Sequence, residues 1–324
     1  MTNIKDILKS NEHYNLIKKI GSLGDEINVC SYLVGGYVRD SLLNRKLTDI
    51  DIMVDKDALL FSKKLAKVLK VNKTVDFEKF LTSRIPYDKC EIEIANAREE
   101  LYDKKSRKPK QVAKTTIEND LIRRDFTINS LAVSLNKNNF GELIDPFNGI
   151  ADLNNVIINT PSSPDITFKD DPLRILRAIR FACQLEFKIH QKIKISIIKN
   201  KERLKIVSKE RITAEIIKIL KCTKPSIGFY LLRELDLLEI VFPELNIMSG
   251  VEIINNKGHK DVFVHTLEVV DNAAKLSNKM KIRFAALVHD IAKPNTKRFD
   301  RKKGWTFHGH DEIGRRMLII VSKR

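Results

Sequence analysis

The stretch that decides the fold reads LVGGYVRD from Leu33 to Asp40, followed by DIDIMV from Asp49 to Val54. In the second segment Asp49 and Asp51 stand two positions apart, so on a strand both carboxylates point to one face of the sheet. Two converging carboxylates can hold one or two Mg²⁺ ions, hard cations that prefer oxygen ligands and bring nucleotide phosphates with them. Taken alone, the pair is a weak signal, because most Asp-x-Asp pairs are solvated.

The upstream segment strengthens this signal, because it places two glycines at a strand-to-helix turn. There the backbone N–H groups of Gly35 and Gly36 and the helix dipole can cradle a phosphate, and Arg39 follows one turn later. The two segments together predict a nucleotide-binding site.

Length and composition define the class of protein around this site. The chain has 324 residues, enough for two or three domains at about 150 residues each. Its 43% hydrophobic and 31% charged residues are typical of a globular protein and exclude collagen and disorder. No apolar run approaches about 18 residues, and the N-terminus lacks a basic and apolar leader, so we expect a cytoplasmic protein without membrane contact. Four irregularly spaced cysteines predict neither disulfides nor a metal site.

The charge balance is strongly basic. The chain carries 59 Lys and Arg against 42 Asp and Glu, a net charge of +17, which indicates a polyanionic partner such as nucleic acid. Between Cys183 and Lys224, twelve basic residues stand against four Glu, so the charge is locally concentrated. The alternative is a chain that is merely rich in lysine.

The hydrophobic pattern predicts α/β order in the first half and helices in the second. Gly21 and Gly24 are expected to end the first helix, and the basic stretch 104–114, which carries Pro109, is expected to be a mobile loop. The predicted segments are a helix at 3–20, strands at 28–34, 49–54 and 90–95, helices at 36–44 and 57–69, and a helical region at 170–245.

Further motifs follow in order along the chain. They read RRDFTINS at 123–130, DPFNGIADL at 145–153, DDPLRILRAIRF at 170–181, and ERI at 210–212 with Glu215. Together with the two opening segments, the set resembles the class II tRNA nucleotidyltransferases, the branch of the polymerase-beta-like superfamily that contains CCA-adding enzymes and bacterial poly(A) polymerases. The resemblance implies an α+β class: a head with a mixed sheet and helices, then an all-α neck and body.

The resemblance also implies a reaction. The 3′-hydroxyl of an RNA end attacks the α-phosphorus of CTP or ATP, and Mg²⁺ held by Asp49 and Asp51 neutralises the developing charge. Families of this kind carry a third carboxylate on a nearby strand. Glu91 and Glu93 share one face, and Glu93 is the candidate because it better fits the family spacing before Ala97-Arg98. A merely solvated strand face is the alternative for this pair.

Two motifs imply nucleotide contacts. Arg123, Arg124 or both can bind triphosphate oxygens, while Asp125 can accept a ribose 2′-hydroxyl; Asn129 belongs to the same motif. Asp171 and Arg174 share a helix face three residues apart, and an acceptor beside a donor fork matches the edges of cytosine and adenine but not those of uracil or guanine. Arg177 and Arg180 continue this stripe toward the triphosphate.

The tail is rich in histidine. The pattern of His265, His289-Asp290, and His308 with His310 resembles the start of an HD phosphohydrolase domain, in which such residues bind one or two divalent metals. These domains carry a further Asp on a later helix, so we expect an incomplete metal site or a truncated chain, with an active and an inert domain both open. His13 and His259 are expected to be ordinary surface histidines.

The predicted organisation is a catalytic head at 1–145, a neck that binds base and RNA at 146–220, a helical body at 221–258 and a partial HD domain at 259–324. The predicted function is Mg²⁺-dependent, template-independent addition of CCA to the 3′ end of tRNA, with ATP and CTP as substrates. Contact with the acceptor stem is expected through shape and backbone charge, along Cys183 to Lys224. A-only, CC-only or poly(A) addition is the alternative within the family, and an HD phosphohydrolase with an inactive head is the alternative outside it.

Overall fold

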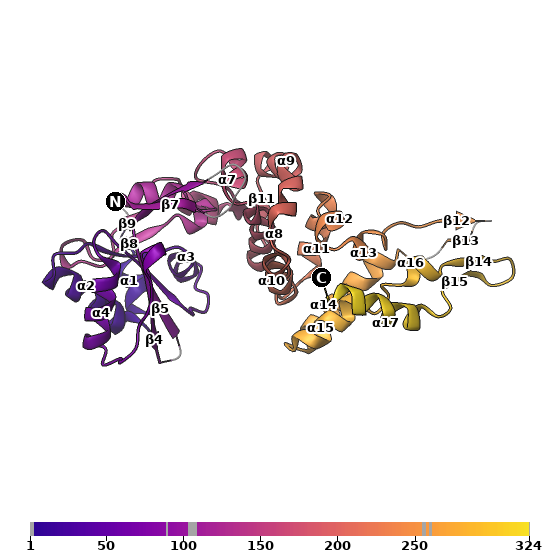
Figure 1. Cartoon of the computed structure of the whole chain (residues 1–324), viewed down its shortest axis with the longest axis horizontal. Helices are drawn as coiled ribbons and strands as arrows, with labels where there is room; N and C mark the ends of the chain where they lie inside the picture. The colour runs from indigo at the N-terminus through magenta and orange to yellow at the C-terminus, as the bar shows by residue number, and fades with distance from the viewer. Residues whose placement is uncertain (1–2, 89, 103–108, 255–256, 259–260, 324) are drawn as a thin grey trace. The chain divides into compact units, whose positions relative to one another are not determined.

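The computed structural model describes residues 3–88, 90–102, 109–254, 257–258 and 261–323 (Figure 1). The chain divides into two compact units, Met1–Asp170 and Asp171–Arg324, each described here by itself. Within the described residues, the helices are too short or too polar to cross a bilayer.

A seven-stranded mixed sheet forms the centre of the first unit, in the order β3-β4-β5-β2-β1-β8-β9. The neighbours pair antiparallel except for β2 and β5, which run parallel. This one parallel pair lies at the middle of the sheet and carries the acidic residues of the candidate site. The strands are β1 (Ser31–Val34), β2 (Ile50–Val54), β3 (Val75–Phe77), β4 (Thr82–Tyr87), β5 (Cys90–Asn96), β8 (Ala132–Ser134) and β9 (Leu143–Ile144).

Side chains alternate between the two faces of β2, which places apolar residues in the core on one face and a carboxylate on the other. Ile50, Ile52 and Val54 are fully buried on one face, which α4 (Ala58–Val68) covers with residues such as Phe61. On the other face Met53 packs in a smaller apolar cluster, so Asp51 shares that face. The remaining helices of this unit are α1 (Lys5–Lys9), α2 (Tyr14–Glu26), α3 (Gly36–Leu42), α5 (Ile117–Ile122), α6 (Gly149–Asn154) and α7 (Pro164–Asp170), with short η1 (Glu78–Phe80), η2 (Thr127–Asn129), η3 (Lys137–Asn139) and β10 (Ile157–Ile158).

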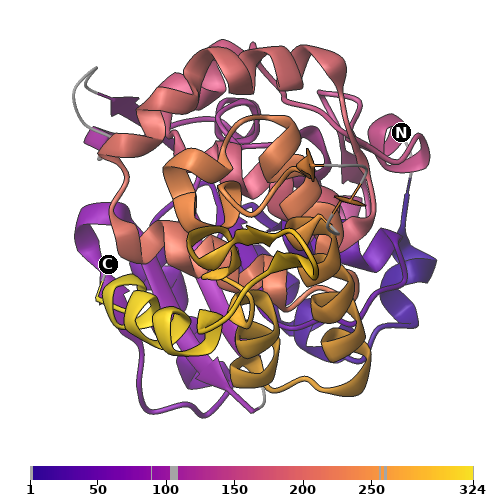
Figure 2. The same cartoon turned by 90° about the vertical axis from the view of Figure 1, so that its right-hand side faces the viewer.

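Helices dominate the second unit (Figures 1 and 2). They are α8 (Leu173–Leu185), α9 (Gln191–Asn200), η4 (Lys201–Ile206), α10 (Lys209–Leu220), α11 (Ser226–Glu234), α12 (Leu238–Val241), α13 (Pro243–Asn246), α14 (Val262–Leu276), α15 (Met280–Val288), α16 (Lys293–Thr296) and α17 (His310–Val321). Short strands also occur here: β11 (Lys188–Ile189), β12 (Ile253–Ile254), β13 (Lys257–Gly258), β14 (Arg298–Asp300) and β15 (Gly304–Thr306). The predicted α+β class, a mixed sheet followed by helices, is confirmed.

A buried arginine ties the helices of this unit together. Arg283, on α15, donates to the carbonyls of Leu220 and Cys222 just where α10 ends, at 2.7 and 2.8 Å. It also donates to the carbonyls of Ala274 and Ser277 at the end of α14, at 3.1 and 2.8 Å. These groups carry the negative ends of the helix dipoles, so they compensate the buried cation without a carboxylate.

The expected first helix was wrong in two respects. Residues 3–20 form two helices, and α2 continues through Gly21 and Gly24 to Glu26. Gly21 serves close packing rather than termination: a Cβ there would lie 2.0 Å from the backbone oxygen of Leu135. A glycine in mid-helix therefore marks a contact that a larger side chain would prevent.

The expected loop at 104–114 was also wrong for its second part. Pro109–Lys114 forms β7, which pairs antiparallel with β6 (Arg98–Tyr102), while residues 103–108 lie outside the described range. Pro109 is the first residue of its strand, where a missing N–H group is tolerated. The segment lacks hydrophobic alternation, so the sequence pattern did not indicate the strand, which is held by backbone pairing with β6.

We predict that Gly21→Ala destabilises the first unit, because the added methyl group cannot avoid the Leu135 carbonyl. The free energy of unfolding should fall by about 2 kcal/mol, although alanine is the better helix former. Gly314→Ala in α17 is the matched control, since its Cβ would meet only ordinary contacts at 3.7 Å. Hydrogen exchange against urea, which reads each unit separately, measures both; an unchanged Gly21→Ala variant would contradict the packing argument.

Candidate active site

Three carboxylates come from the parallel strand pair at the centre of the first unit. The register of β2 and β5 sets Asp51 directly opposite Glu93. Asp49 lies one residue before β2, is exposed, and accepts a hydrogen bond from the backbone N–H of Glu91 at 3.4 Å. Arg84 on β4 pairs with Glu93 at 2.9 Å and with Glu91 at 3.3 Å. Thus Asp51 and Glu93 face each other, and an arginine that the sequence did not single out balances part of their charge.

The charge on Asp51 is costly in the folded chain. The pKa of this carboxyl is raised to about 6: burial is the largest cause, the neighbouring Glu93 and Asp49 act in the same direction, and Arg124 and Arg84 oppose them. Excess negative charge of this kind is relieved by a bound cation. The oxygen donors present therefore fit a divalent metal.

The glycine turn adjoins this acidic cluster. Gly35 has φ +67°, and a Cβ on it would lie 2.9 Å from Nη1 of Arg124 and 3.8 Å from Oδ2 of Asp51. The turn, the guanidinium and the carboxylate therefore surround one point. The N–H group of Gly35 itself donates to the carbonyl of Leu131, so this amide is committed within the protein.

Both arginines of the RRD motif bind one buried carboxylate that the sequence analysis missed. Asp120 is 1% exposed and accepts from Arg123 at 2.6 and 3.1 Å and from Nε of Arg124 at 3.1 Å. Burial acts to raise the pKa of Asp120, but the two guanidinium groups outweigh it and lower that pKa. The spacing i, i+3 and i, i+4 across α5 is the signal that could have identified it. Of the two arginines, Arg124 is the one that lies against Gly35.

Three further residues that were predicted to bind nucleotide, Arg39, Asp125 and Asn129, are buried. Arg39 is 4% exposed; it donates to Asn129 at 2.6 Å and to both oxygens of Asp40 at 2.7 and 3.0 Å. Asn129 in turn donates to Asp125 at 3.0 Å. The predicted nucleotide ligands Arg39, Asp125 and Asn129 thus form one internal chain of hydrogen bonds behind the glycine turn.

In the second unit, the predicted stripe occurs on and just before α8. Asp171, Arg174, Arg177 and Arg180 recur every three residues, which is the spacing of one helix face, and all four are half-buried. Asp171 accepts from the backbone of Leu173 at 3.1 Å and pairs with Arg211 at 3.4 Å.

The far end of this stripe is tied to α10. Arg180 pairs with the buried Glu215 at 2.8 Å, and Arg177 and Arg180 both lie over the ring of Phe181. Glu215, noted in the sequence as part of the following motif, is therefore an ion-pair partner of α8.

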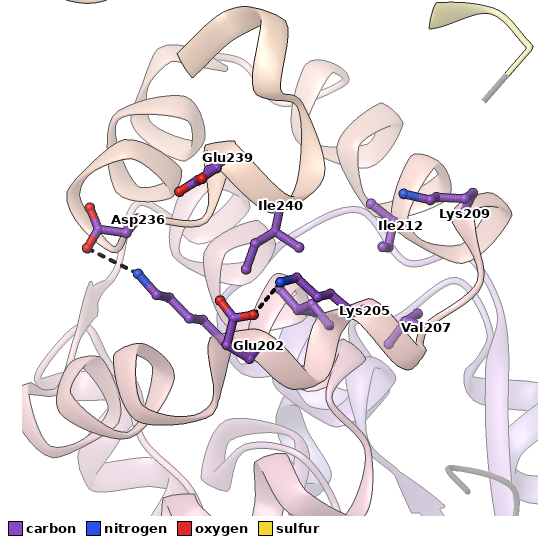
Figure 3. Close-up of a pocket in the computed structure, with 10 residues that line it drawn as sticks. Glu202, Lys205, Val207, Lys209, Ile212, Asp236, Glu239 and Ile240 are labelled. Carbon is purple, nitrogen blue, oxygen red and sulfur yellow. Dashed lines mark hydrogen bonds and ion pairs between the residues drawn. The ribbon is translucent and has the colours of Figure 1, made fainter. Parts of the chain in front are cut away.

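The basic stretch from Cys183 to Lys224 is partly neutralised within the unit. A hollow of about 290 Å³ is lined by residues of η4, α10 and α12. Lys201 pairs there with Asp236 at 3.3 Å and Lys205 with Glu202 at 2.5 Å (Figure 3). Glu202 within η4 and Asp236 between α11 and α12 thus offset part of the positive charge counted in the sequence.

The histidines of the tail do converge. His265, His289 and Asp290 offer ligand atoms that all lie within 4.8 Å of one another. Asp290 lies 3.1 Å from Nε2 of His289, 3.7 Å from Nε2 of His310 and 2.6 Å from Nζ of Lys293. Among the described residues, this is the one group of three or more that meets that distance. His308 is exposed and stands outside it, and His259 lies outside the described residues.

The protonation of this group is biased by its contacts. Burial acts to raise the pKa of Asp290, but hydrogen bonds from His289 and Lys293 outweigh it and hold it at about 2. The same hydrogen bond raises the pKa of His289. Nδ1 of His289 lies 2.9 Å from the carbonyl of Ala286, an arrangement that leaves Nε2 facing the carboxylate.

Comparison with known proteins decides the family. The poly A polymerase head domain matches residues 31–159, the probable RNA and SrmB-binding site of polymerase A matches 186–248, and the HD domain matches 262–324. The multifunctional CCA protein of Pseudoalteromonas atlantica is 35% identical over 302 residues, covering 87% of this chain and 68% of that protein. The chain belongs to the tRNA nucleotidyltransferase family that includes the CCA-adding enzymes. The resemblance seen in the motifs is confirmed.

Other members extend this comparison. The A-adding tRNA nucleotidyltransferase of Geobacter sulfurreducens is 35% identical over 71% of this chain, which spans about a quarter (26%) of that protein. A solved CCA-adding enzyme in an apo form superposes with a TM-score of 0.73 at 30% identity, covering 93% of this chain and 68% of that one. A tRNA nucleotidyltransferase complexed with a primer tRNA and an incoming ATP analogue gives 0.67 at 28% identity, covering 83% of this chain and 75% of that one.

We predict that Asp51→Asn stabilises the protein at neutral pH. The carboxyl has a pKa of about 6 in the folded chain against an ordinary value of 3.8, so the folded state becomes less favourable as the pH rises through this window. The neutral amide should raise the free energy of unfolding by about 2 kcal/mol at pH 7, and by nothing below about pH 4. Urea unfolding at the two pH values, without divalent metal, measures this. A variant that is less stable than the wild-type chain at pH 7 would contradict the conclusion that the charged Asp51 carboxylate destabilises the folded state.

Proposed function

We propose that this chain adds nucleotides without a template to the 3′ end of tRNA, completing the CCA sequence from CTP and ATP. The observation that carries the proposal is the pairing of Asp51 opposite Glu93, with Arg124 and the Gly35 turn around the same point. The reaction forms a bond between the tRNA 3′-oxygen and the α-phosphorus and breaks the bond to pyrophosphate, while the 3′-hydroxyl gives up its proton.

Asp49, Asp51 and Glu93 are the residues that would hold a divalent metal, for which we propose Mg²⁺. Bound there, it would supply charge neutralisation for the phosphates and a lowered pKa for the attacking hydroxyl. The chain's own contribution is a fixed set of oxygen donors. Arg84 pairs with Glu93 and opposes the negative charge on Asp51, so it keeps the cluster folded without such a cation.

The RRD motif supplies the phosphate contact in this proposal. Asp120 holds the guanidinium of Arg124 against the glycine turn, and Arg124 binds triphosphate oxygens there. Arg123 is held by the same carboxylate. Behind them the chain from Arg39 through Asn129 to Asp125 fixes the turn, so these three act by positioning, and ribose selection by Asp125 would require this chain of bonds to open.

Selection of the base is assigned to Asp171 and Arg174. The acceptor and the donor fork at i and i+3 match the amino group and ring nitrogen that cytosine and adenine share. A wrong base would leave a hydrogen-bonding group unpaired, which is a strong penalty in a closed site. A-only addition is the alternative within the family, because the A-adding relative shares the same identity with this chain.

We predict that Glu93→Gln and Glu91→Gln separate a metal ligand from a structural neighbour. Both glutamates pair with Arg84, but only Glu93 lies opposite Asp51. With tRNA lacking its CCA end and with CTP plus ATP, Glu93→Gln should lower kcat by about a hundredfold or more, comparable to the loss of an electrostatic group at a reacting centre. Glu91→Gln should stay within about fivefold.

The products of the same assay decide the specificity. Two C residues and then one A, absent in an Asp49→Ala, Asp51→Ala double variant, would establish CCA addition. A single A would establish the alternative. No extension by the folded wild-type chain, or equal loss in Glu91→Gln and Glu93→Gln, would overturn the proposal or the assignment of Glu93.

A second activity is proposed for the tail, metal-dependent hydrolysis of phosphoesters. The observation that favours it is the convergence of His265, His289 and Asp290. The same carboxylate is bound by Lys293 at 2.6 Å, a cation that competes with metal for that oxygen. Hydrolysis therefore depends on whether a divalent metal displaces the lysine.

We predict that a Lys293→Gln variant binds Ni²⁺ or Mn²⁺ at least tenfold more tightly than the wild-type chain, because the competing cation is gone. Calorimetric titration measures affinity, and hydrolysis of bis(p-nitrophenyl) phosphate measures turnover. His289→Ala is the control that should abolish the hydrolysis and the part of the metal binding that Lys293→Gln strengthens, while metal binding at Asp49, Asp51 and Glu93 stays. Metal binding that is unaffected by His289→Ala would place the ion elsewhere and contradict the proposed site.

A further inference from the structure

A second concentration of positive charge lies on the β14–β15 hairpin, outside the sites described so far. Figure 2 draws this hairpin in gold within the second unit. Over Lys297–Lys303 five basic side chains stand against one acidic one, and four of the five are exposed. The segment from Lys297 to Trp305 is termed the basic hairpin, and its exposed cations are Arg298, Arg301, Lys302 and Lys303.

The turn of the hairpin uses its own acidic residue. Oδ1 of Asp300 accepts from the backbone N–H groups of Lys302 and Lys303, at 2.8 and 2.7 Å. An Asx-type turn of this kind orders the tip of the hairpin. The carboxylate is thereby held at the backbone, while the side chains of Arg301, Lys302 and Lys303 are exposed.

An aromatic pair braces the base of the hairpin. Phe299 and Trp305 are cross-strand partners whose rings lie 5.3 Å apart in an edge-to-face arrangement. Lys297 lies 5.2 Å above the indole and pairs with Glu252 at 2.6 Å. This cation is therefore engaged within the unit, and the side chains of Arg298, Arg301, Lys302 and Lys303 are exposed on a braced ribbon.

We propose that the basic hairpin binds the phosphate backbone of RNA, as a contact separate from the candidate active site and from the stretch Cys183–Lys224. Much of that stretch is paired with acidic residues, as at Lys201 and Lys205, whereas the hairpin carries one acid for five bases. Cations displayed beside aromatic rings are the composition that tracks nucleic acid strands. The identity of the RNA as tRNA rests on the proposed function.

The chain offers an internal reporter for this contact. Trp305 is its single tryptophan, so intrinsic indole fluorescence reads the hairpin alone. RNA that occupies the hairpin should change this fluorescence, and the change should saturate with the tRNA concentration. The measurement needs no substitution, so it tests the proposal even where a variant folds poorly.

The experiment uses the full chain and tRNA lacking its CCA end. The variant Arg301→Gln, Lys302→Gln, Lys303→Gln removes three charges and leaves the backbone contacts of Asp300 in place. The control, Lys64→Gln, Lys67→Gln, Lys73→Gln, removes three exposed charges from α4 and the segment after it. We expect the hairpin variant to bind about tenfold more weakly at 0.1 M salt, and the slope of log K against log salt to shrink by about 2 to 3. The control should stay within about twofold.

Several results would overturn the proposal. These are equal weakening in the two variants, an unchanged Trp305 signal at saturating tRNA, or a signal produced by phosphatidylserine vesicles or polyglutamate but not by tRNA. Nucleotide addition is measured in parallel. Wild-type chain that binds tRNA with a Trp305 change but does not extend it refutes the proposed function alone. Normal extension with an unaffected hairpin variant refutes the hairpin alone.

Discussion

Everything at the candidate active site depends on one backbone pairing, the parallel register of β2 with β5. It is the single parallel pair in the described sheet, and it sets Asp51 against Glu93 at the centre of the unit rather than at an exposed edge. Two carboxylates in that position repel each other and lose hydration, which is why the pKa of Asp51 rises to about 6. The arginines nearby therefore lower the electrostatic cost of this cluster. Arg84 lies on β4 and pairs with Glu93 and Glu91, and Arg124 lies against the glycine turn and shares Asp120 with Arg123.

This arrangement separates the residues proposed to contact a substrate from the residues that hold other side chains in place. Asp120 binds Arg123 and Arg124 at once, and Arg39 binds Asn129, which binds Asp125. Buried charges satisfied in this way contribute little net stability, but removing one partner leaves the other uncompensated. Within the motif RRDFTINS, the guanidinium of Arg124 thus lies against the glycine turn, while the buried Asp125 and Asn129 are hydrogen-bonded to each other. The same logic recurs at Arg283, where helix ends take the place of carboxylates.

The sequence predicted the fold class, and it predicted which side chains share a face where local spacing determines geometry. The stripe of Asp171, Arg174, Arg177 and Arg180 follows from helix periodicity, and the predicted carboxylates Asp51 and Glu93 lie opposite each other on neighbouring strands. The roles of these residues in the reaction stay predictions. The sequence-based prediction failed where contacts with a distant segment determine the local structure. Gly21 indicated a helix end, but the Leu135 carbonyl, 114 positions away, requires the glycine inside a helix. Pro109–Lys114 lacked alternation because its strand is held by β6 through the backbone. Arg84 and Asp120 could be found only by knowing which strands and helices meet.

Net charge is the quantity that the sequence described least well, because it counts cations without their partners. Twelve basic residues between Cys183 and Lys224 suggested one continuous RNA contact, yet Lys194, Lys201, Lys205 and Lys218 are each paired with an acid. Exposed ion pairs of this kind are weak, so RNA phosphate can exchange with the carboxylate, but each exchange forfeits an existing attraction. The basic hairpin carries one acid against five bases over Lys297–Lys303, and an oxygen of that acid accepts from the backbone of the turn. The proposed affinity for a polyanion therefore rests on the local ratio of cations to carboxylates rather than on the number of lysines.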